Sequence, residues 1–220
     1  AVGSYALYYN TTGENNISIG HKASYLNTTG SGNISLGRSA LYYNQTGNSN
    51  TALGFRSLRN NTASNNTAVG QTSLYYNTTG TSNTAVGDNA LRNNATASDN
   101  TAVGSNALFN NRGENNTAVG SSALFNNDAE NNTAVGSYAL YYNTTGYNTA
   151  IGYQASYLNT TGSGNISLGQ ATLRYNRTGN SNTAIGFSSL QNNTASDNTA
   201  LGFDALYSNL TGAENTAVGS

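Results

Sequence analysis

A five-residue segment, Asn-Thr-Ala-Val-Gly, recurs along the chain and constrains its fold more than any other feature. It stands at 66–70, 83–87, 100–104, 116–120 and 132–136, with variants such as Asn-Thr-Ala-Ile-Gly at 148–152 and Asn-Ile-Ser-Leu-Gly at 33–37. Successive glycines of this segment are always 16 or 17 residues apart. A fixed period of this kind is typical of solenoids, in which each repeat is one structural unit.

Aligning the repeats on this glycine places the whole chain, residues 1–220, in a single repeat array of thirteen full repeats with partial ends. Because both ends fall within a repeat, we expect the sequence to be a window of a longer fibre. The glycines expected to form a structural ladder are Gly20, Gly37, Gly54, Gly70, Gly87, Gly104, Gly120, Gly136, Gly152, Gly169, Gly186 and Gly202.

Composition excludes several classes of partner. Only 8% of the residues are charged, and eight basic residues stand against nine acidic ones, so no strong field would attract nucleic acid. Apolar runs are only a few residues long, so we expect no membrane insertion in this segment. Without cysteine the chain has no disulfide or thiolate metal site. Apolar positions recur in every repeat, which indicates an ordered chain.

The residues before the glycine have the pattern of a short strand. The residue directly before it is always Val, Ile or Leu, the one before that is Ala or Ser, and the third is Thr or Ile. Such alternation predicts a strand with one large apolar side and one small-residue side. We expect the large side to face the core.

The residues after the glycine predict a second strand. A small residue and then Leu follow, three and four places on, as in Ala40 and Leu41. In Ala23-Ser24-Tyr25-Leu26 and in 155–158, Ser takes the fourth place and Leu lies two residues later. A shift of two keeps a side chain on the same side of a strand but not of a helix.

Two asparagines in each repeat mark predicted corners. One stands seven residues after the glycine and the other four before the next glycine, without exception from Asn10 to Asn215. Repeat length varies only between them, as turns allow. Asparagine accepts left-handed backbone geometry, and stacked asparagine side chains can hydrogen-bond in ladders.

These patterns predict an all-β fold, a parallel β-solenoid or β-roll in which each 16–17-residue repeat is one coil. Coils would stack about 4.8 Å apart. A lone coil buries too little to offset the ordering of its backbone, so stacking is obligatory. The segments 3–13 and 136–146 are identical. Such block duplication lengthens an array without changing its cross-section, which favours a spacer or fibre.

The repeats resemble two related groups of fibre proteins. The core Ala-Val-Gly-x-x-Ala-Leu, as at 118–124, is similar to the head repeats of YadA-like trimeric autotransporter adhesins. The longer pattern with Asn-Thr-Thr-Gly resembles repeats of phage tail fibres and bacterial surface proteins that end in an endosialidase-type chaperone domain. This resemblance implies a left-handed β-roll of three chains in an extracellular or virion-borne fibre. The longer period and the Asn-Thr-Thr-Gly insertion depart from the adhesin pattern.

The residues themselves also suggest a homo-oligomer. The strand side opposite the predicted core carries only Ala, Ser or Thr, and small residues allow another chain to approach closely. We therefore expect self-association into a trimer or an end-to-end filament. The alternative is a single-chain solenoid whose small-residue side faces solvent.

Candidate glycosylation sites coincide with the corner asparagines. Nine of the thirteen asparagines seven residues after the glycine lie in Asn-x-Ser/Thr sequons: Asn10, Asn27, Asn44, Asn77, Asn94, Asn143, Asn159, Asn176 and Asn209. The other four, Asn61, Asn111, Asn127 and Asn193, stay asparagine without the sequon. Corner geometry therefore explains these asparagines better than glycosylation does, although attached glycans stay an alternative.

Two residue patterns suggest binding functions. A threonine column, including Thr51, Thr67 and Thr84, resembles the flat arrays of ice-binding solenoids, although Ile17, Ile34 and Ile166 interrupt it. Tyrosine pairs could stack sugar rings; the alternative is that they shield a corner of the coil. The pairs are Tyr8-Tyr9, Tyr42-Tyr43, Tyr75-Tyr76 and Tyr141-Tyr142.

Nothing in the sequence indicates catalysis, a cofactor or a metal. His21 is the single histidine, and acidic residues such as Glu14 and Asp128 lie in variable turns without paired spacing. The sequence thus predicts a non-catalytic structural shaft of a fibre, filament or adhesin, located outside the cell, on its surface or on a virion. A carbohydrate- or host-binding fibre segment is the first alternative and an ice-binding solenoid the second.

Overall fold

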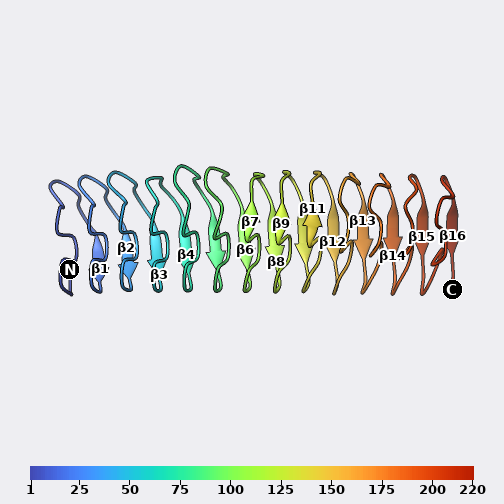
Figure 1. Ribbon diagram of the computed structural model, residues 1–220, viewed down its shortest axis with the longest axis horizontal. Coiled ribbons are helices and arrows are strands. Elements are labelled where there is room, and N and C mark those ends of the chain that lie inside the picture. Colours follow the sequence, from blue (N-terminus) through green and yellow to red (C-terminus); the bar gives the residue numbers. More distant parts are fainter. The chain divides into compact units, whose positions relative to one another are not determined.

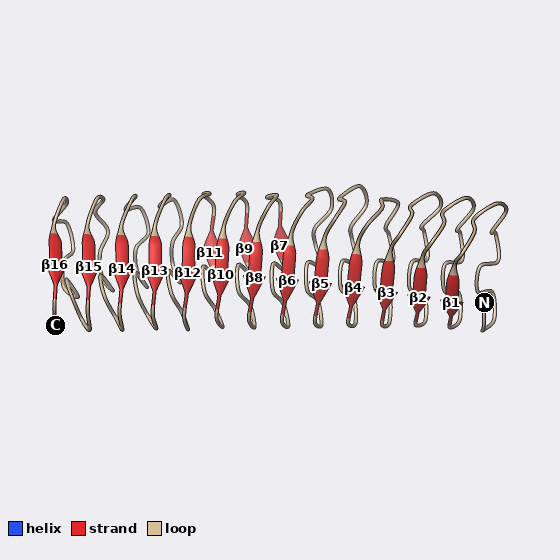
Figure 2. Cartoon of the chain, turned by 180° about the vertical axis from the view of Figure 1, so that it is seen from behind, coloured by secondary structure: helices blue, strands red, loops and turns tan.

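The computed structural model describes residues 1–220 and divides into two compact units, 1–114 and 115–220. Each unit is a succession of similar coils, one per repeat (Figure 1). The only regular elements are short strands, and there is no helix (Figure 2). Each unit is therefore an all-β structure built from a single type of coil.

The strands of the first unit lie in the recurring segment before each glycine. They form a parallel sheet in chain order, and Val2 adds a parallel bridge to Ile19. These strands are β1 (Ile17–Ile19), β2 (Ile34–Leu36), β3 (Thr51–Leu53), β4 (Thr67–Val69), β5 (Thr84–Val86) and β6 (Thr101–Val103). A two-residue strand, β7 (Asn110–Asn111), lies near the end of the unit.

The second unit repeats this arrangement. Its parallel sheet has the order β8 (Thr117–Val119), β10 (Thr133–Val135), β12 (Thr149–Ile151), β13 (Ile166–Leu168), β14 (Thr183–Ile185), β15 (Thr199–Leu201) and β16 (Thr216–Val218). The shorter strands β9 (Asn126–Asn127) and β11 (Tyr142–Asn143) pair with each other in parallel.

The register of these strands confirms that one repeat is one turn of a parallel β-solenoid. Ile17 pairs with Ile34, and Thr51 pairs with Thr67, so each residue meets its equivalent in the next repeat. The same holds between Thr149 and Ile166 in the second unit. Because a parallel partner is always the next coil, the sheet hydrogen bonds exist only between coils, and stacking is required.

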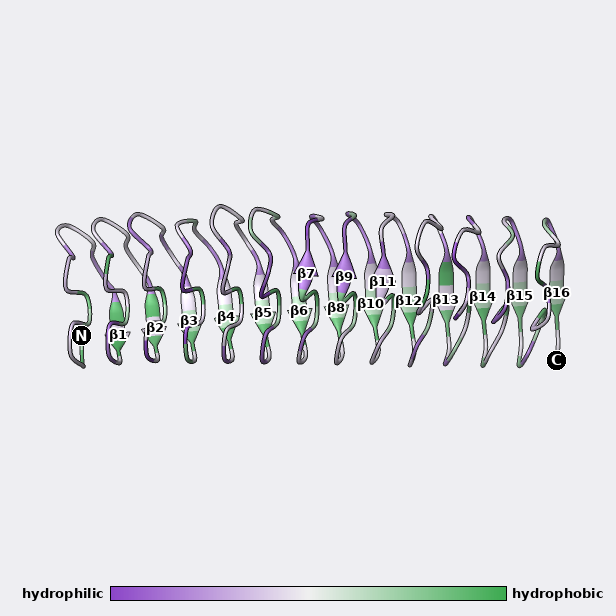
Figure 3. Cartoon of the chain, in the orientation of Figure 1, coloured by the Kyte–Doolittle hydropathy of each residue, from purple (hydrophilic) through white to green (hydrophobic).

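The inward and outward sides of the strands are the reverse of our prediction. The small residue two before the glycine faces inward, and Ala68 and Ala85 are 0% exposed. Val86 and Ile151, directly before the glycine, are 36% and 43% exposed. The hydrophobic colour at the C-terminal ends of the strands in Figure 3 marks these outward-facing residues. The large apolar side of the strand is therefore outside the coil.

The thin interior of the coil explains this reversal. The leucine four residues after the glycine, such as Leu74 or Leu124, is fully buried. In the second unit Leu173 and Leu190 belong to one buried cluster with Ala184 and Ala200 of the strands. A second large side chain from the strand would overpack this space, so the strand contributes only a small side chain, Ala or Ser.

The segment after the glycine is a series of turns, so our prediction of a second strand there is wrong. Two of its residues have positive φ, for example Ser39 (58°) and Leu41 (50°). The Ser39 amide donates to His21 O in the preceding coil (3.0 Å), and the Leu41 amide donates to Ser57 O in the next (3.1 Å). These inter-coil bonds offset a left-handed backbone cost of about 1–2 kcal/mol per residue.

The displaced leucines also differ from the prediction. Leu26 is half-buried and does not fill the interior. The buried Ser24 occupies the interior position that leucine has in other coils. The Ser24 hydroxyl lies 2.8 Å from that of Ser35, which in turn donates to Ser18 (2.8 Å). Serine replaces alanine in these strands because a buried hydroxyl requires a partner.

Candidate functional site

A column of buried asparagines runs through each unit at the position seven residues after the glycine. Asn77 Nδ2 donates to Asn61 Oδ1 (2.7 Å) and to Gly80 O (2.8 Å), and Asn77 Oδ1 accepts from Asn94 Nδ2 (3.1 Å). These asparagines are fully buried. Each amide thus bonds to the coil before it, to the coil after it and to its own turn, which confirms the predicted asparagine ladder.

The asparagine four residues before the glycine forms a second buried column. Asn66 Oδ1 accepts from the Asn83 amide (3.0 Å), and Asn83 Nδ2 donates to Ala97 O (2.9 Å). The second unit repeats this pattern with Asn148 and Asn165 (3.0 Å). Both columns satisfy backbone groups that the loop would otherwise bury without partners.

The candidate glycosylation sites all lie in the first of these columns. Those from Asn27 to Asn176 are buried, and Asn94 Nδ2 uses both hydrogens, toward Asn77 Oδ1 (3.1 Å) and Ala97 O (2.8 Å). Asn10 and Asn209 are half-exposed. A glycan on a buried Nδ2 would replace one of these hydrogens and open the ladder. Glycosylation stays a prediction, and the folded coil opposes it at the buried positions.

The glycines of the predicted ladder, the glycine file, have a backbone conformation that only glycine accepts. Their φ angles lie between 123° and 139°, a region closed to other residues. A Cβ on Gly20 would stand 2.8 Å from the carbonyl carbon of Gly37, and one on Gly120 would stand 2.6 Å from that of Gly136. The glycines therefore set how closely consecutive coils approach.

The outward side of each sheet carries two files of side chains. Val69 pairs with Val86 along one file and Thr67 pairs with Thr84 along the other. Ile17 and Ile166 replace threonine and make the second file apolar in places. This side is an exposed sheet surface of Val, Ile, Leu and Thr that continues from coil to coil within each unit.

A stack of rings and guanidinium groups occupies the position five residues after the glycine. The Tyr25 and Tyr42 rings are stacked, with centroids 5.1 Å apart and an interplanar angle of 27°. Arg59 Cζ continues the stack 5.1 Å from the Tyr42 centroid and 5.9 Å from that of Tyr75. The ring faces are covered by neighbours, so these tyrosines cannot stack on sugars.

Neither this stack nor the arginines in it were predicted from the sequence. Arg59, Arg92 and Arg174 stand where other repeats have Tyr or Phe, which is the signal that could have identified them. The Nε atoms of Arg59 and Arg174 are buried without a hydrogen-bond partner. Contact of the guanidinium with the rings partly offsets the loss of hydration.

Three tyrosines of this stack have raised pKa values. A hydrogen bond with Tyr9, followed by burial, raises the pKa of Tyr25 to about 12. Burial, and then the nearby Tyr142 and Tyr157, raises the pKa of Tyr141. Burial is also the main cause of the raised pKa of Tyr157. These hydroxyls stay protonated at neutral pH.

The remaining candidate groups do not form a centre. His21 is exposed, and its ring meets that of Tyr5 edge-on at 6.3 Å. No three His, Asp or Glu side chains lie close enough together to hold a metal ion, and the surface has no pocket. The absence of catalysis stays a prediction.

Comparison of the chain with protein-family models gives no match, and comparison with curated proteins gives none either. The structure contains no helix of the length and apolarity that crossing a lipid bilayer requires. The coil and its surfaces are therefore the basis for any proposed function.

Proposed function

We propose that the chain is a self-associating, non-catalytic structural segment of an extracellular or virion-borne fibre, filament or adhesin shaft. One observation carries the proposal: the Val/Ile/Leu file faces outward. An apolar sheet side that recurs in every coil is typical of a surface that pairs with another chain. The resemblance to adhesin head repeats and tail-fibre repeats supports the same function and location.

A second copy of this chain would match the Val/Ile/Leu file better than an unrelated partner. The file has one residue per coil, so a copy packed alongside would place like residues opposite each other all along the sheet. With a net charge of −1 and 8% charged residues, little electrostatic repulsion opposes association. The small-residue side of the strand cannot form the contact between chains that we expected, because those residues are inside the coil. The trimer stays our proposal on the outward apolar file.

Molar mass in solution tests this proposal. We expect light scattering to give three times the 22.8 kDa of one chain. Replacing Val86 and Val103 together by Lys should reduce the mass to that of a single chain, because charges would be buried between copies. A matched control places Lys at the exposed loop residues Thr29 and Thr79 and should leave the mass unchanged. A monomeric unaltered chain would refute self-association.

Ice binding is a second candidate, favoured by the outward position of the threonine file. Thr67 and Thr84 are in register on the same exposed sheet side as the valines. Binding to ice requires this side to be open, whereas self-association covers it. Thermal hysteresis of the unaltered chain, abolished by Thr84→Lys, would support ice binding, and no hysteresis would exclude it.

A further inference from the structure

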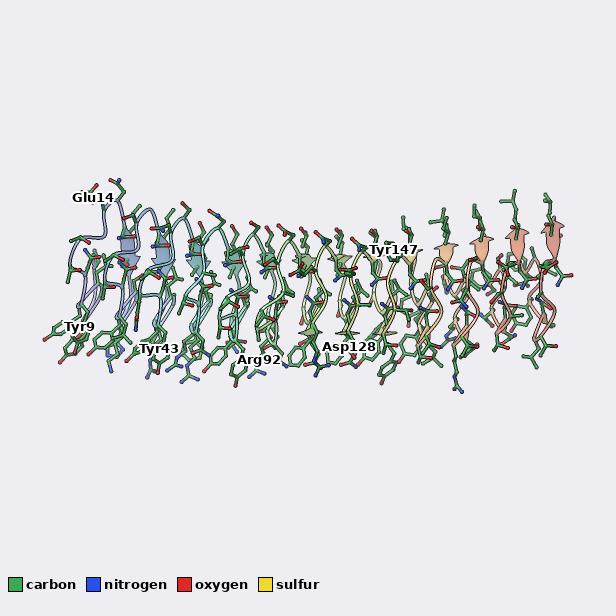
Figure 4. The ribbon with its side chains drawn as sticks, turned by 90° about the horizontal axis from the view of Figure 1, so that it is seen from above. Tyr9, Glu14, Tyr43, Arg92, Asp128 and Tyr147 are labelled. Carbon is green, nitrogen blue, oxygen red and sulfur yellow. The ribbon has the colours of Figure 1, made fainter.

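The tyrosines six residues after the glycine form a pattern that the proposed structural function does not use. Over residues 9–76 and 142–175 they occur in alternate coils: Tyr9, Tyr43 and Tyr76 in the first unit, and Tyr142 and Tyr175 in the second. The coils between them carry Leu26 and Asn60, and Leu158. The remaining coils have Asn93, Asn110, Asn126, Asn192 and Ser208 at this position. Figure 4 shows Tyr9 and Tyr43 on the side of the first unit away from its strands, together with Arg92. They are therefore separate from the outward Val/Ile/Leu file.

These rings lie flat on the stack beneath them. Tyr9 is nearly perpendicular to both Tyr8 (4.9 Å, 83°) and Tyr25 (5.1 Å, 82°), which are themselves stacked face to face (5.8 Å, 17°). Because the faces of Tyr8 and Tyr25 meet each other, only their edges are available to Tyr9. One face of Tyr9 therefore rests on these edges, and the residue is 47% exposed.

The same arrangement recurs farther along the chain, with arginine in the underlying stack. Arg59 Cζ lies 4.9 Å from the Tyr43 centroid, and Arg92 Cζ lies 5.3 Å from that of Tyr76. Tyr43 and Tyr76 are 38% and 44% exposed. Arg59 Nη1 also donates to Asn60 Oδ1 (3.3 Å) in the coil between them. An aromatic ring thus alternates with an amide and a cation along this surface.

We propose that this surface binds a linear β-1,4-linked polysaccharide. Adjacent coils are one strand spacing apart, so Tyr43 and Tyr76 are separated by about 9.6 Å. In an extended β-1,4-linked chain each sugar is turned over relative to the next, so every second sugar presents the same C–H face at a repeat close to this distance. One such sugar stacks on Tyr43 and the next but one on Tyr76.

The sugar between them lies over the amide and the guanidinium. Asn60 Nδ2 and Arg59 can donate hydrogen bonds to its hydroxyls, which gives the alternation of apolar and polar contacts that such a chain requires. An α-1,4-linked chain coils and cannot keep the two-coil spacing. The linkage, rather than the identity of each sugar, therefore determines binding to this surface.

Titration calorimetry of the full chain with cellohexaose, chitohexaose and maltohexaose tests the proposal. We expect at least one β-linked hexasaccharide to bind about tenfold or more tightly than α-linked maltohexaose, the effect of roughly one well-formed ring contact. Tyr76→Ala should weaken binding about tenfold, and Tyr76→Phe should preserve it. Tyr147→Ala, at a loop tyrosine that is not six residues after a glycine of the recurring segment, is the control and should bind as the unaltered chain does. Equal affinity for all three sugars, or binding of none, would overturn the proposal.

A register exchange tests the spacing directly. Asn60→Tyr combined with Tyr76→Asn keeps the composition and moves one ring to the adjacent coil. We expect β-linked binding to weaken about tenfold, as with Tyr76→Ala, because Tyr9 and Tyr43 stay in place, while circular dichroism and molar mass stay unchanged. Undiminished affinity would refute the two-coil spacing. Because molar mass reports self-association separately, failure of the sugar site and failure of the proposed fibre function are distinguishable.

Discussion

The interior of each coil has two parts that are equally buried and differently stabilised. Between the strand and the turns, Leu74 and Ala85 are buried without side-chain polar atoms. Between the two corners, Asn77 and Asn83 are also 0% exposed, and their amides bond to backbone and side-chain groups of their own and neighbouring coils. One part depends on apolar burial, which has no direction, and the other on hydrogen bonds, which do.

This difference explains where the repeats tolerate change. In the apolar part, leucine is replaced by Ser24 and Ser156, and each of them pairs with a strand serine, Ser35 or Ser167. The corner asparagines are never replaced in any repeat. Asparagine is the one short side chain with two donors and an acceptor, whereas aspartate lacks the donors. The asparagine column is continuous only if each side chain donates a hydrogen bond to one neighbouring coil and accepts one from the other. A residue that cannot do both interrupts the column.

The glycine file holds both parts at the coil spacing, and breaking it should have the largest effect. Gly120→Ala introduces a Cβ 2.6 Å from the Gly136 carbonyl carbon at a φ of 133°. Together, strain and the backbone clash should cost about 4 kcal/mol or more. Urea denaturation of the full chain measures the loss.

Gly219→Ala separates the two causes of this loss. Gly219 has a similar φ of 127°, but a Cβ there meets nothing within 4 Å. Its substitution should cost only the backbone strain, about 1–3 kcal/mol. Equal losses at Gly120 and Gly219 would show that close approach of the coils is not what requires glycine.

Asn77→Ala tests the hydrogen-bonded part. It removes two donated bonds and one accepted bond, so we expect a loss of about 3 kcal/mol in the free energy of unfolding. Asn10→Ala is the matched control at the end of the column, where the side chain donates only to Gly13 O and accepts from Asn27. A smaller loss is expected there. If Asn77→Ala cost no more than Asn10→Ala, continuity of the column would not matter.

The sequence was sufficient to predict one coil per repeat, parallel stacking, and the glycine and asparagine files. Each of these predictions follows from the repeat period and from a property of one residue type. Gly70 can adopt a positive φ, and Asn77 has two hydrogen-bond donors on one side chain. Such capacities are local and can be read without knowing the rest of the coil.

The direction of the side chains could not be read in the same way. Alternation in Thr67-Ala68-Val69 shows that two sides exist, but not which of them is inside. That depends on how much space Leu74 leaves, a tertiary quantity. The turns after the glycine could not be predicted from the sequence, because leucine rarely adopts a left-handed conformation. Leu41 does so here and donates a hydrogen bond to the next coil.

Two serines introduced into the apolar part test whether a buried hydroxyl pair is stabilising there. Leu74→Ser alone leaves a buried hydroxyl without the serine partner that Ser24 has. Adding Ala85→Ser supplies the equivalent of the Ser24–Ser35 contact, eleven residues apart in both cases. We expect a favourable coupling of about 1 kcal/mol in a double-mutant cycle. Strict additivity of the two substitutions would show that the serines of the native repeats do not stabilise each other.

The aromatic stack outside both parts should make stability depend on alkaline pH. The pKa of Tyr25 is about 12 in the folded chain, above the usual value of 10.0. The folded state therefore holds this proton more tightly, so its contribution is complete below pH 10 and is lost as the pH rises toward 12. Tyrosinate absorbance and urea denaturation across this interval measure both. Tyrosines that all ionise together near pH 10, with unchanged stability, would contradict the prediction.

The smallest expected effect is a gain in stability at Gly32, which does not belong to the glycine file. Gly32 has a φ of 67°, and other repeats place Asn15 or Asn65 at this position. A Cβ on Gly32 meets nothing nearer than Ser49 Oγ at 3.8 Å. Gly32→Asn should therefore stabilise the chain by about 0.5 kcal/mol, because restricting the unfolded state outweighs the small left-handed strain that asparagine carries. Gly164, with the same φ in the second unit, provides an independent repeat of the test. A loss at both positions would mean that the left-handed strain of asparagine outweighs its restriction of the unfolded state, and that this turn, like the glycine file, requires glycine for its backbone conformation.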